Sequence, residues 1–127
     1  MSATSPTTIP REPVLIRYAR TRTQPKRDGS MNRLEREWSL VLEARRRAGQ
    51  IARWDFQPVK LRLADRTFYE PDFRVIALDG TIEMHETKGF MEDDAAVKLK
   101  VAAEQHPYRF VLVRKLKGVW SETPVGE

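Results

Sequence analysis

The chain contains no cysteine, which excludes disulfide bonds, thiol nucleophiles and a cysteine-ligated zinc site. Its two histidines form no paired metal-binding motif, and it lacks the glycine-rich lysine motif that cradles nucleotide phosphates. Apolar runs are short throughout, and the longest candidate near the N-terminus, residues 14–16, is too short for the core of a signal peptide. We therefore expect a cytoplasmic protein with no membrane partner.

Positive charge is concentrated at the N-terminus. Of the formal net charge of +5, residues 1–30 carry +4, from six basic and two acidic side chains. This stretch is also rich in proline, serine and threonine, so we expect a flexible arm there, a folded domain over residues 31–116 and a tail over 117–127. The arm either binds phosphates, serves only as a solubilising leader, or adds an extended segment near residues 14–18 to a sheet edge.

A helix is predicted to begin near residue 30 and to end at Gly49. Apolar residues recur at helical spacing from Leu34 onward, and Trp38 lies in this stripe as a core anchor. Either Ser30 or Asn32 is suited to cap the first turn.

The rest of the chain predicts strands, a second helix and a last strand. Residues 53–63, 66–77 and 81–87 have strand-like patterns, and residues 78–80 form the loop of a hairpin. A second helix is expected from Asp93 or Asp94 to Gln105, followed by a strand over residues 108–114 that pairs in parallel through a right-handed crossover. The predicted fold is α/β, in the order helix, three strands, helix, strand, with a mixed central sheet.

The length of the hairpin loop decides which charged side chains share a face. A two-residue turn would pair Asp72 with Thr87, whereas a three-residue loop with Gly80 in the left-handed conformation pairs Asp72 with Glu86. We favour the second register, in which the two Cβ atoms are about 4.5 to 5.5 Å apart and Lys88 shares their face. Two carboxylates so placed could bind one Mg²⁺, although such charges in an ordinary hairpin are simply solvated.

These residues form a motif. The string Tyr-x-Pro-Asp-Phe at residues 69–73 precedes Glu-x-Lys at residues 86–88, and Glu35 and the Gln57-Pro58 pair lie upstream. Over residues 31–114 the chain resembles the PD-(D/E)xK nuclease superfamily, most closely its small phage-type nucleases, and it is also similar to transposon-end-cutting and Holliday junction resolving endonucleases. The resemblance implies a restriction-endonuclease-like core and a metal-dependent DNA endonuclease of a bacterial or phage-infected cell.

The resemblance also implies roles for individual residues. Asp72, Glu86 and the backbone carbonyl of Thr87 would bind Mg²⁺, for which Mn²⁺ would substitute, and Lys88 would act as the catalytic cation. Glu35, preferred over Glu37, would be an outer or additional acidic ligand. We prefer Lys98 to Lys100 as a phosphate contact because residues two apart in a helix project in different directions. The predicted nucleic-acid-binding residues are Gln57, Lys60, Lys98, Arg20, Arg22, Lys26 and Arg27.

Two other functions remain open on the sequence. The fold could serve a DNA-binding protein without catalysis, or a structural component that binds a partner protein. His85 precedes Glu86 in the predicted strand and is expected to point to the opposite face, away from the acidic pair. For a nuclease, branched or recombination-intermediate DNA is the first substrate we expect, and a homodimer would act on two strands.

Overall fold

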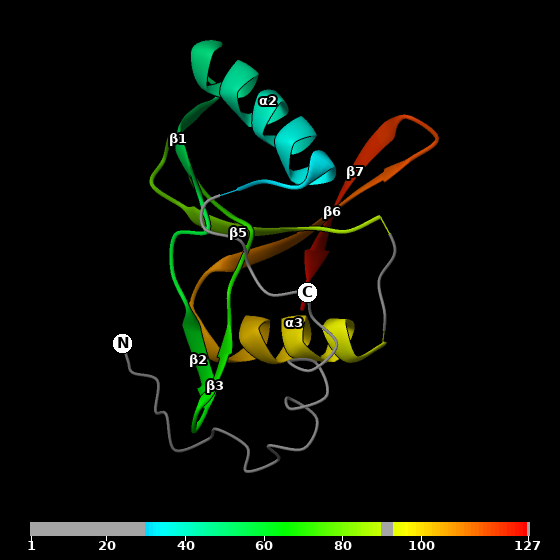
Figure 1. Ribbon diagram of the computed structural model, residues 1–127. Helices are drawn as coiled ribbons and strands as arrows, with labels where there is room; N and C mark the ends of the chain where they lie inside the picture. Colours follow the sequence, from blue (N-terminus) through cyan, green and yellow to red (C-terminus); the bar gives the residue numbers. More distant parts are fainter. Residues whose placement is uncertain (1–29, 90–92, 127) are drawn as a thin grey trace.

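The structure, a computed structural model, describes residues 30–89 and 93–126 (Figure 1). The elements in chain order are α2 (Arg33–Arg47), β1 (Ile51–Phe56), β2 (Leu61–Ala64), β3 (Thr67–Tyr69), β4 (Phe73–Ala77), β5 (Ile82–Thr87), α3 (Asp93–Gln105), β6 (Arg109–Leu116) and β7 (Val119–Val125). A five-stranded sheet has the order β1-β4-β5-β6-β7, and β2 and β3 form a separate two-stranded sheet. The β5 and β6 pair is parallel and the other pairs are antiparallel, so the expected α/β fold with a mixed sheet is confirmed.

The helix α2 begins and ends at signals that the sequence carries. Asn32 accepts a hydrogen bond from the Glu35 N–H at 2.7 Å, and the Asn32 N–H donates to Oε1 of Glu35 at 2.9 Å. This reciprocal capping box identifies Asn32 as the N-cap. At the other end Gly49 has a φ of +76°, which allows the chain to leave the helix through a left-handed residue. The predicted stop at Gly49 is thus confirmed.

The hairpin of β4 and β5 has the predicted three-residue loop. Phe73 pairs with His85, and Ala77 N–H donates to the Thr81 carbonyl at 2.9 Å across the loop. Gly80 has a φ of +92°, a conformation that a residue with a Cβ rarely adopts. The paired residues end at Phe73 and His85, and the preceding Asp72 N–H donates to the His85 carbonyl at 3.1 Å, next to Glu86 in the chain.

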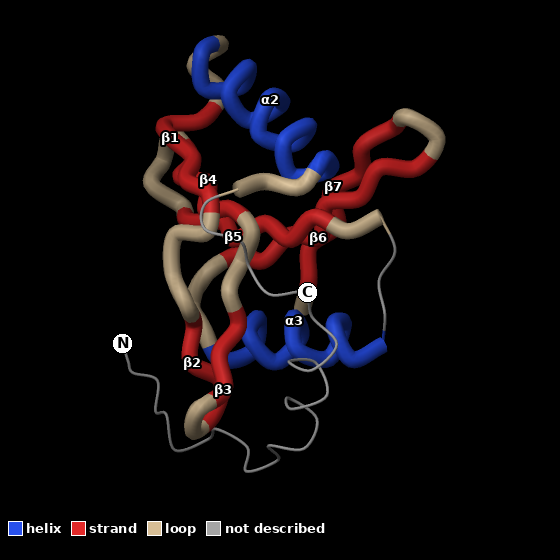
Figure 2. The backbone as a smooth tube through the Cα atoms, viewed as in Figure 1, coloured by secondary structure: helices blue, strands red, loops and turns tan. Residues whose placement is uncertain are grey.

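The two long strands predicted before the hairpin were wrong in their extent. Residues 53–63 divide into β1 and β2, and residues 66–77 divide into β3 and β4, with the breaks at Gln57-Pro58 and Glu70-Pro71. Proline has no N–H for a sheet ladder and confines pairing. Figure 2 shows the result, in which β2 and β3 leave the main sheet and lie beside α3.

The second half of the chain contains the predicted helix and parallel strand, and one further strand. The helix α3 connects β5 to β6, which pair in parallel from Glu83 with Arg109 to Thr87 with Val113. The C-terminal stretch expected to be a tail instead forms β7, which pairs with β6 along its length. Its Pro124 obscured the strand pattern, but β7 is an edge strand, where proline is tolerated.

Apolar side chains form a core on each face of the sheet. Trp38 and Leu42 of α2 pack on Phe73, Val75 and neighbouring strand residues on one face. On the other face, residues of α3 pack with the inner sides of β2 and β3 and with Met84 and Phe110. The two helices therefore cover opposite faces (Figure 1), and the motif of residues 69–73 and 86–88 lies at strand ends between them.

Candidate functional site

Four strands bring their ends together at one position in the sheet. Gln57 N–H, just after β1, donates to the Asp72 carbonyl at 2.7 Å, and Asp72 N–H donates to the His85 carbonyl at 3.1 Å. Farther along β5, Lys88 N–H donates to the Val113 carbonyl of β6 at 2.9 Å. The main chain thus sets the Gln-Pro, Pro-Asp and Glu-x-Lys segments in adjacent positions.

The carboxylate of Asp72 is buried and fixed in orientation. The residue is 2% exposed. Its Oδ2 accepts hydrogen bonds from the Thr87 N–H at 2.9 Å and from the Thr87 hydroxyl at 3.0 Å. Two donors from one residue hold the carboxylate against rotation. Asp72 therefore contacts both neighbours of Glu86 in β5.

Glu86 lies beside Asp72 and is held through both of its oxygens. It is 6% exposed. Its Oε1 accepts a hydrogen bond from the Tyr69 hydroxyl at 2.5 Å, and its Oε2 lies 3.0 Å from Nζ of Lys88. The Lys88 side chain is 33% exposed, so it connects the buried carboxylate with the surface. This contact confirms that Glu86 and Lys88 share a face.

Tyr69 is a residue of this site that the sequence reasoning missed. Burial raises its pKa well above the ordinary value, and the nearby charges of Glu86 and Asp72 raise it further. The buried hydroxyl is therefore close enough to both carboxylates for their charges to raise its pKa. The signal was present, because Tyr69 opens the Tyr-x-Pro-Asp-Phe string, but it was used only as part of a motif and its hydroxyl was given no role.

The two carboxylates fit Mg²⁺ better than they fit a structural zinc ion. Among residues 30–89 and 93–126, no three His, Cys, Asp or Glu side chains group so as to hold a metal ion. Structural zinc needs four such protein ligands. Mg²⁺ usually binds one or two carboxylates and completes its shell with water and substrate phosphates. A pair of buried carboxylates fits Mg²⁺ in this respect. The Thr87 N–H donates to Asp72, and the part of the Thr87 carbonyl as a metal ligand stays a prediction.

Glu35 has a structural role that the sequence reasoning did not assign. It is 5% exposed and is the N3 residue of the capping box, with Oε1 occupied by the Asn32 N–H. The simpler alternative, a solvated glutamate, is wrong because the side chain is buried. Within the described chain Glu35 forms no three-acid cluster with Asp72 and Glu86, so its part as an outer acidic ligand stays a prediction.

The predicted nucleic-acid contacts are distributed over several elements. Gln57 is half-buried and adopts a φ of +48°, which is unusual for a residue other than glycine and indicates strain. Lys60 is exposed on the loop between β1 and β2, and Lys98 is half-buried on α3, whereas Lys100 is exposed. Four arm residues lie outside the described residues: Arg20, Arg22, Lys26 and Arg27.

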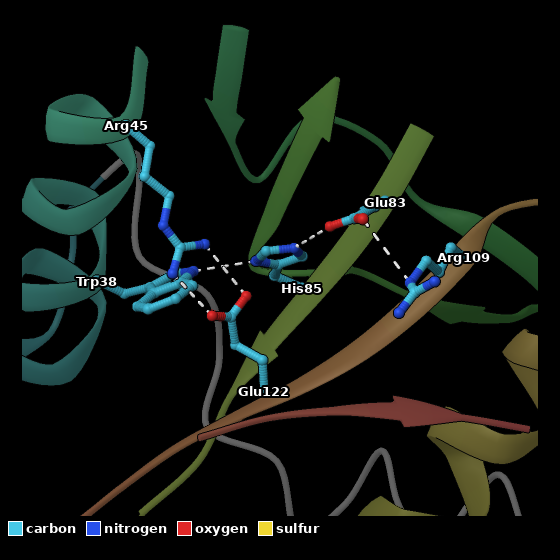
Figure 3. A network of polar contacts seen from close by, with 6 residues as sticks. All are labelled: Trp38, Arg45, Glu83, His85, Arg109 and Glu122. Atoms are coloured by element: carbon cyan, nitrogen blue, oxygen red, sulfur yellow. Dashed lines mark hydrogen bonds and ion pairs between the residues drawn. The ribbon is translucent and has the colours of Figure 1, made fainter. Parts of the chain in front are cut away.

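His85 belongs to the opposite face of β5, as expected (Figure 3). It is 1% exposed, and its Nδ1 accepts a hydrogen bond from Nε1 of Trp38 at 3.1 Å. The indole nitrogen can only donate, so in the neutral imidazole the proton lies on Nε2, which is 2.9 Å from Oε1 of Glu83. This contact joins α2 to β5 next to Glu86.

Arginines surround the same network (Figure 3). Arg45 of α2 makes a two-point ion pair with Glu122 of β7 at 2.7 and 3.2 Å and lies over the Trp38 ring. The hydrogen bond with His85 lowers the pKa of Glu83, and the charges of Arg109 and Arg45 lower it further against the effect of burial. The network stabilises the contact of α2 with three strands and leaves the acidic pair on the other face.

Comparisons of the chain with protein-family models, with curated proteins and with solved structures gave no match. Within the described part of the chain, no helix combines the length and apolar character needed to cross a bilayer. The case for a function therefore rests on the motif and on the geometry of the residues that carry it.

Proposed function

We propose that the protein is a Mg²⁺-dependent DNA endonuclease with a restriction-endonuclease-like core. One observation carries the proposal. Asp72 and Glu86 are both buried at the ends of adjacent strands, close enough to the Tyr69 hydroxyl that both charges raise its pKa, and Lys88 reaches Oε2 of Glu86 at 3.0 Å. Buried carboxylates are rare unless they are paired or bind a metal, so this arrangement favours a site over a set of solvated charges.

Each residue has a role that its chemistry explains. A divalent cation held by Asp72 and Glu86 would supply charge neutralisation at the scissile phosphate and a water of lowered pKa. Lys88, with three donors and a partly exposed side chain, would stabilise negative charge on the phosphate or orient the attacking water. In the reaction, the water oxygen bonds to phosphorus, the P–O ester bond breaks, and the products are a phosphate monoester and a hydroxyl end.

The topology supports the same proposal. Along the main sheet α2 is followed by three strands, by α3 and by the parallel strand β6, with β2 and β3 inserted and β7 added at the edge. This is the succession that the family resemblance implies. Fold and function are separate questions, so the acidic pair and the lysine, not the topology, carry the assignment.

The proposed substrate is DNA with a branch or another recombination intermediate. Gln57 would contact a phosphate or a metal-bound water, because its main chain is joined to Asp72 at 2.7 Å. Lys60, Lys98 and the basic residues of the arm would bind phosphates farther from the site. A homodimer would place two such sites on two strands.

The proposal is tested by cleavage of matched linear duplex, single-stranded and four-way-junction DNA with Mg²⁺ or Mn²⁺. We expect metal-dependent cutting by the wild type, fastest on the junction, and none by Asp72→Asn. The asparagine keeps an oxygen for the two Thr87 donors, so the fold and DNA binding should persist. Glu104→Gln, an exposed carboxylate of α3, is the matched control that should cut normally.

Other outcomes separate the alternatives. Tight DNA binding that survives a chelator, with no cutting under either metal, would favour a binding protein without catalysis. No binding to any of the three DNAs would favour a structural component. Equal cutting by Asp72→Asn and the wild type would overturn the site assignment.

A further inference from the structure

We propose that Tyr69 is a positioning residue that holds Oε1 of Glu86 by a hydrogen bond and directs Oε2, the oxygen that Lys88 also contacts, toward the metal. The inference rests on the proposed function and deepens it, because it assigns the metal preference of the site to a residue that binds neither metal nor DNA.

The contacts of Glu86 define the two oxygens. Oε1 is 2.5 Å from the Tyr69 hydroxyl, which donates the hydrogen bond, and Oε2 is 3.0 Å from Nζ of Lys88. A hydrogen bond from a neutral donor to a carboxylate oxygen at this distance is among the stronger ones in proteins. Rotating the carboxylate would break both contacts at once. Tyr69 therefore fixes the orientation of the carboxylate, in which the oxygen that it does not contact points toward Lys88.

The tyrosine itself cannot move away. Its residue is buried and belongs to the apolar core beneath α3. Its ring packs against the ring of Phe110, with centroids 6.4 Å apart, and its main chain pairs with Leu61 in the two-stranded sheet. The hydroxyl is thus presented by a rigid element outside the main sheet. This gives the inserted β2 and β3 strands a function at the site.

Use of one oxygen has a consequence for metal choice. Mg²⁺ requires near-ideal octahedral geometry with short bonds, and a carboxylate that binds through one oxygen suits it. Ca²⁺ accepts six to eight oxygens in a flexible geometry and takes one or both oxygens of a carboxylate. By occupying Oε1, the Tyr69 hydroxyl opposes two-oxygen binding and so favours Mg²⁺ or Mn²⁺ over Ca²⁺.

The test is metal binding to the full chain without DNA, measured by calorimetry with Mg²⁺, Mn²⁺ and Ca²⁺. Partners that orient a metal ligand typically contribute about 10- to 100-fold in affinity. We expect Tyr69→Phe, which keeps the ring and removes only the hydroxyl, to lose about that much Mg²⁺ and Mn²⁺ affinity. Ca²⁺ affinity should fall less or rise, so the ratio of Mg²⁺ to Ca²⁺ affinity should drop. Tyr108→Phe, a half-buried tyrosine that stacks on His106, is the matched control and should behave as the wild type.

The outcomes separate this inference from the proposed function. Wild-type affinities for all three metals in Tyr69→Phe would overturn the positioning role alone. An equal loss for Mg²⁺ and Ca²⁺ would also overturn it, because it would indicate general damage to the site. If the wild type binds none of the metals, the proposed function fails and the inference with it.

A second measurement covers the case in which Tyr69→Phe does not fold. In wild-type protein labelled with fluorotyrosine, the Tyr69 fluorine signal is assigned by elimination with Tyr18→Phe and Tyr108→Phe. We expect this signal to shift on addition of Mg²⁺ and to remain unshifted in Glu86→Gln. A signal that ignores Mg²⁺ in the wild type would overturn the inference.

Discussion

At the scale of single residues, backbone strain and buried charge occur together at the strand ends. Gln57 is held at a φ of +48° by the hydrogen bond from its N–H to the Asp72 carbonyl. Arg66 and Lys117 also have positive φ, but both lie in hairpin turns, where such conformations are common. Strain outside a turn persists only where surrounding contacts enforce it, and such residues cluster at functional sites.

This strain predicts opposite effects of one substitution on stability and on activity. A left-handed residue with a Cβ costs about 1–2 kcal/mol, and glycine loses roughly 0.5–1 kcal/mol through the entropy of the unfolded chain. We expect Gln57→Gly to stabilise the protein by up to about 1 kcal/mol in urea unfolding, yet to slow cleavage because the amide is lost. Arg66→Gly relieves similar strain away from the acidic pair and should stabilise without slowing cleavage. A Gln57→Gly variant that cuts as fast as the wild type would show that the side chain has no role.

Lys88 provides a second prediction at this scale. Loss of one donor that stabilises transition-state charge typically lowers kcat by about 100-fold or more. We expect that loss in Lys88→Met, with metal binding retained, since protonated lysine is not a ligand. Lys115→Met removes another strand lysine, paired with Glu37 at 2.9 Å, and should leave kcat unchanged. Normal turnover by Lys88→Met would remove Lys88 from the catalytic group.

At the scale of elements, one carboxylate adds hydrogen bonds to the apolar contact of α2 with β1. Glu43 accepts hydrogen bonds from Arg46 at 2.7 and 3.0 Å, from Trp54 of β1 at 2.9 Å and from Arg47 at 3.1 Å. These contacts lower the pKa of Glu43 from 4.5 to about 2. The hydrogen bond with Arg46 contributes most to this shift, and the hydrogen bond with Trp54 contributes next. Ionised Glu43 is thus a link between the helix and the sheet edge.

The lowered pKa predicts an acid-dependent loss of stability. A carboxyl group whose pKa is lower in the folded state stabilises that state above its ordinary pKa, and the effect is lost as pH falls toward the folded value. For Glu43 this window runs from about 4.5 down to about 2. We expect Glu43→Gln to flatten the fall of the unfolding free energy across that window, measured by urea unfolding at several pH values. The exposed Glu104→Gln should leave the curve unchanged, and an unchanged curve for Glu43→Gln would contradict the assignment.

Elements defined by local signals were predictable from the sequence. The sequence left Ser30 and Asn32 as alternative caps of the helix, of which the structure has Asn32. The helix end followed from Gly49 and the hairpin loop from Gly80, because caps and turns depend on residues a few positions apart. The parallel placement of β6 followed from the intervening helix. The division of the early strands was missed at both prolines. At Pro58 the apolar positions shift phase, from Trp54 and Phe56 to Val59 and Leu61, and this signal was not used, whereas across Pro71 the alternation continues and only tertiary pairing shows the break.

The part of the site that depends on the local hairpin could also be predicted from the sequence. Register alone placed Asp72 beside Glu86 and Lys88 on their face. Tyr69 contacts Glu86 from a strand of another sheet, and the capping role of Glu35 competes for the same carboxylate that the motif assigns to the metal. Such contacts depend on how separate elements pack, which periodicity does not encode.

At the scale of the whole molecule, most of the surplus positive charge lies in residues 1–29, outside the described residues. Residues 1–29 carry a net +4, which leaves +1 for the part that contains both cores and the acidic pair. The folded part therefore contributes little nonspecific attraction for DNA. If the arm binds phosphates, affinity and salt dependence should reside largely in it.

Removal of the arm separates binding from chemistry. Each phosphate contact contributes about 0.9 to the slope of log affinity against log salt on duplex DNA. We expect deletion of residues 1–29 to weaken DNA binding and to make this slope shallower, while cleavage at saturating DNA is retained. A full-length variant in which Arg20, Arg22, Lys26 and Arg27 are changed to glutamine controls for length and should behave like the deletion. Unchanged binding by both would mean that the segment is a solubilising leader.

The most direct test of the central claim is nicking of supercoiled plasmid by the purified protein with Mg²⁺, with Glu86→Gln beside it. The amide keeps an acceptor for the Tyr69 hydroxyl and removes the charge that a metal requires, so the fold should be preserved. We expect the wild type to cut only with a divalent metal, and the variant to bind DNA without cutting. Equal cutting by the two proteins, or cutting by the wild type in a chelator, would contradict the account.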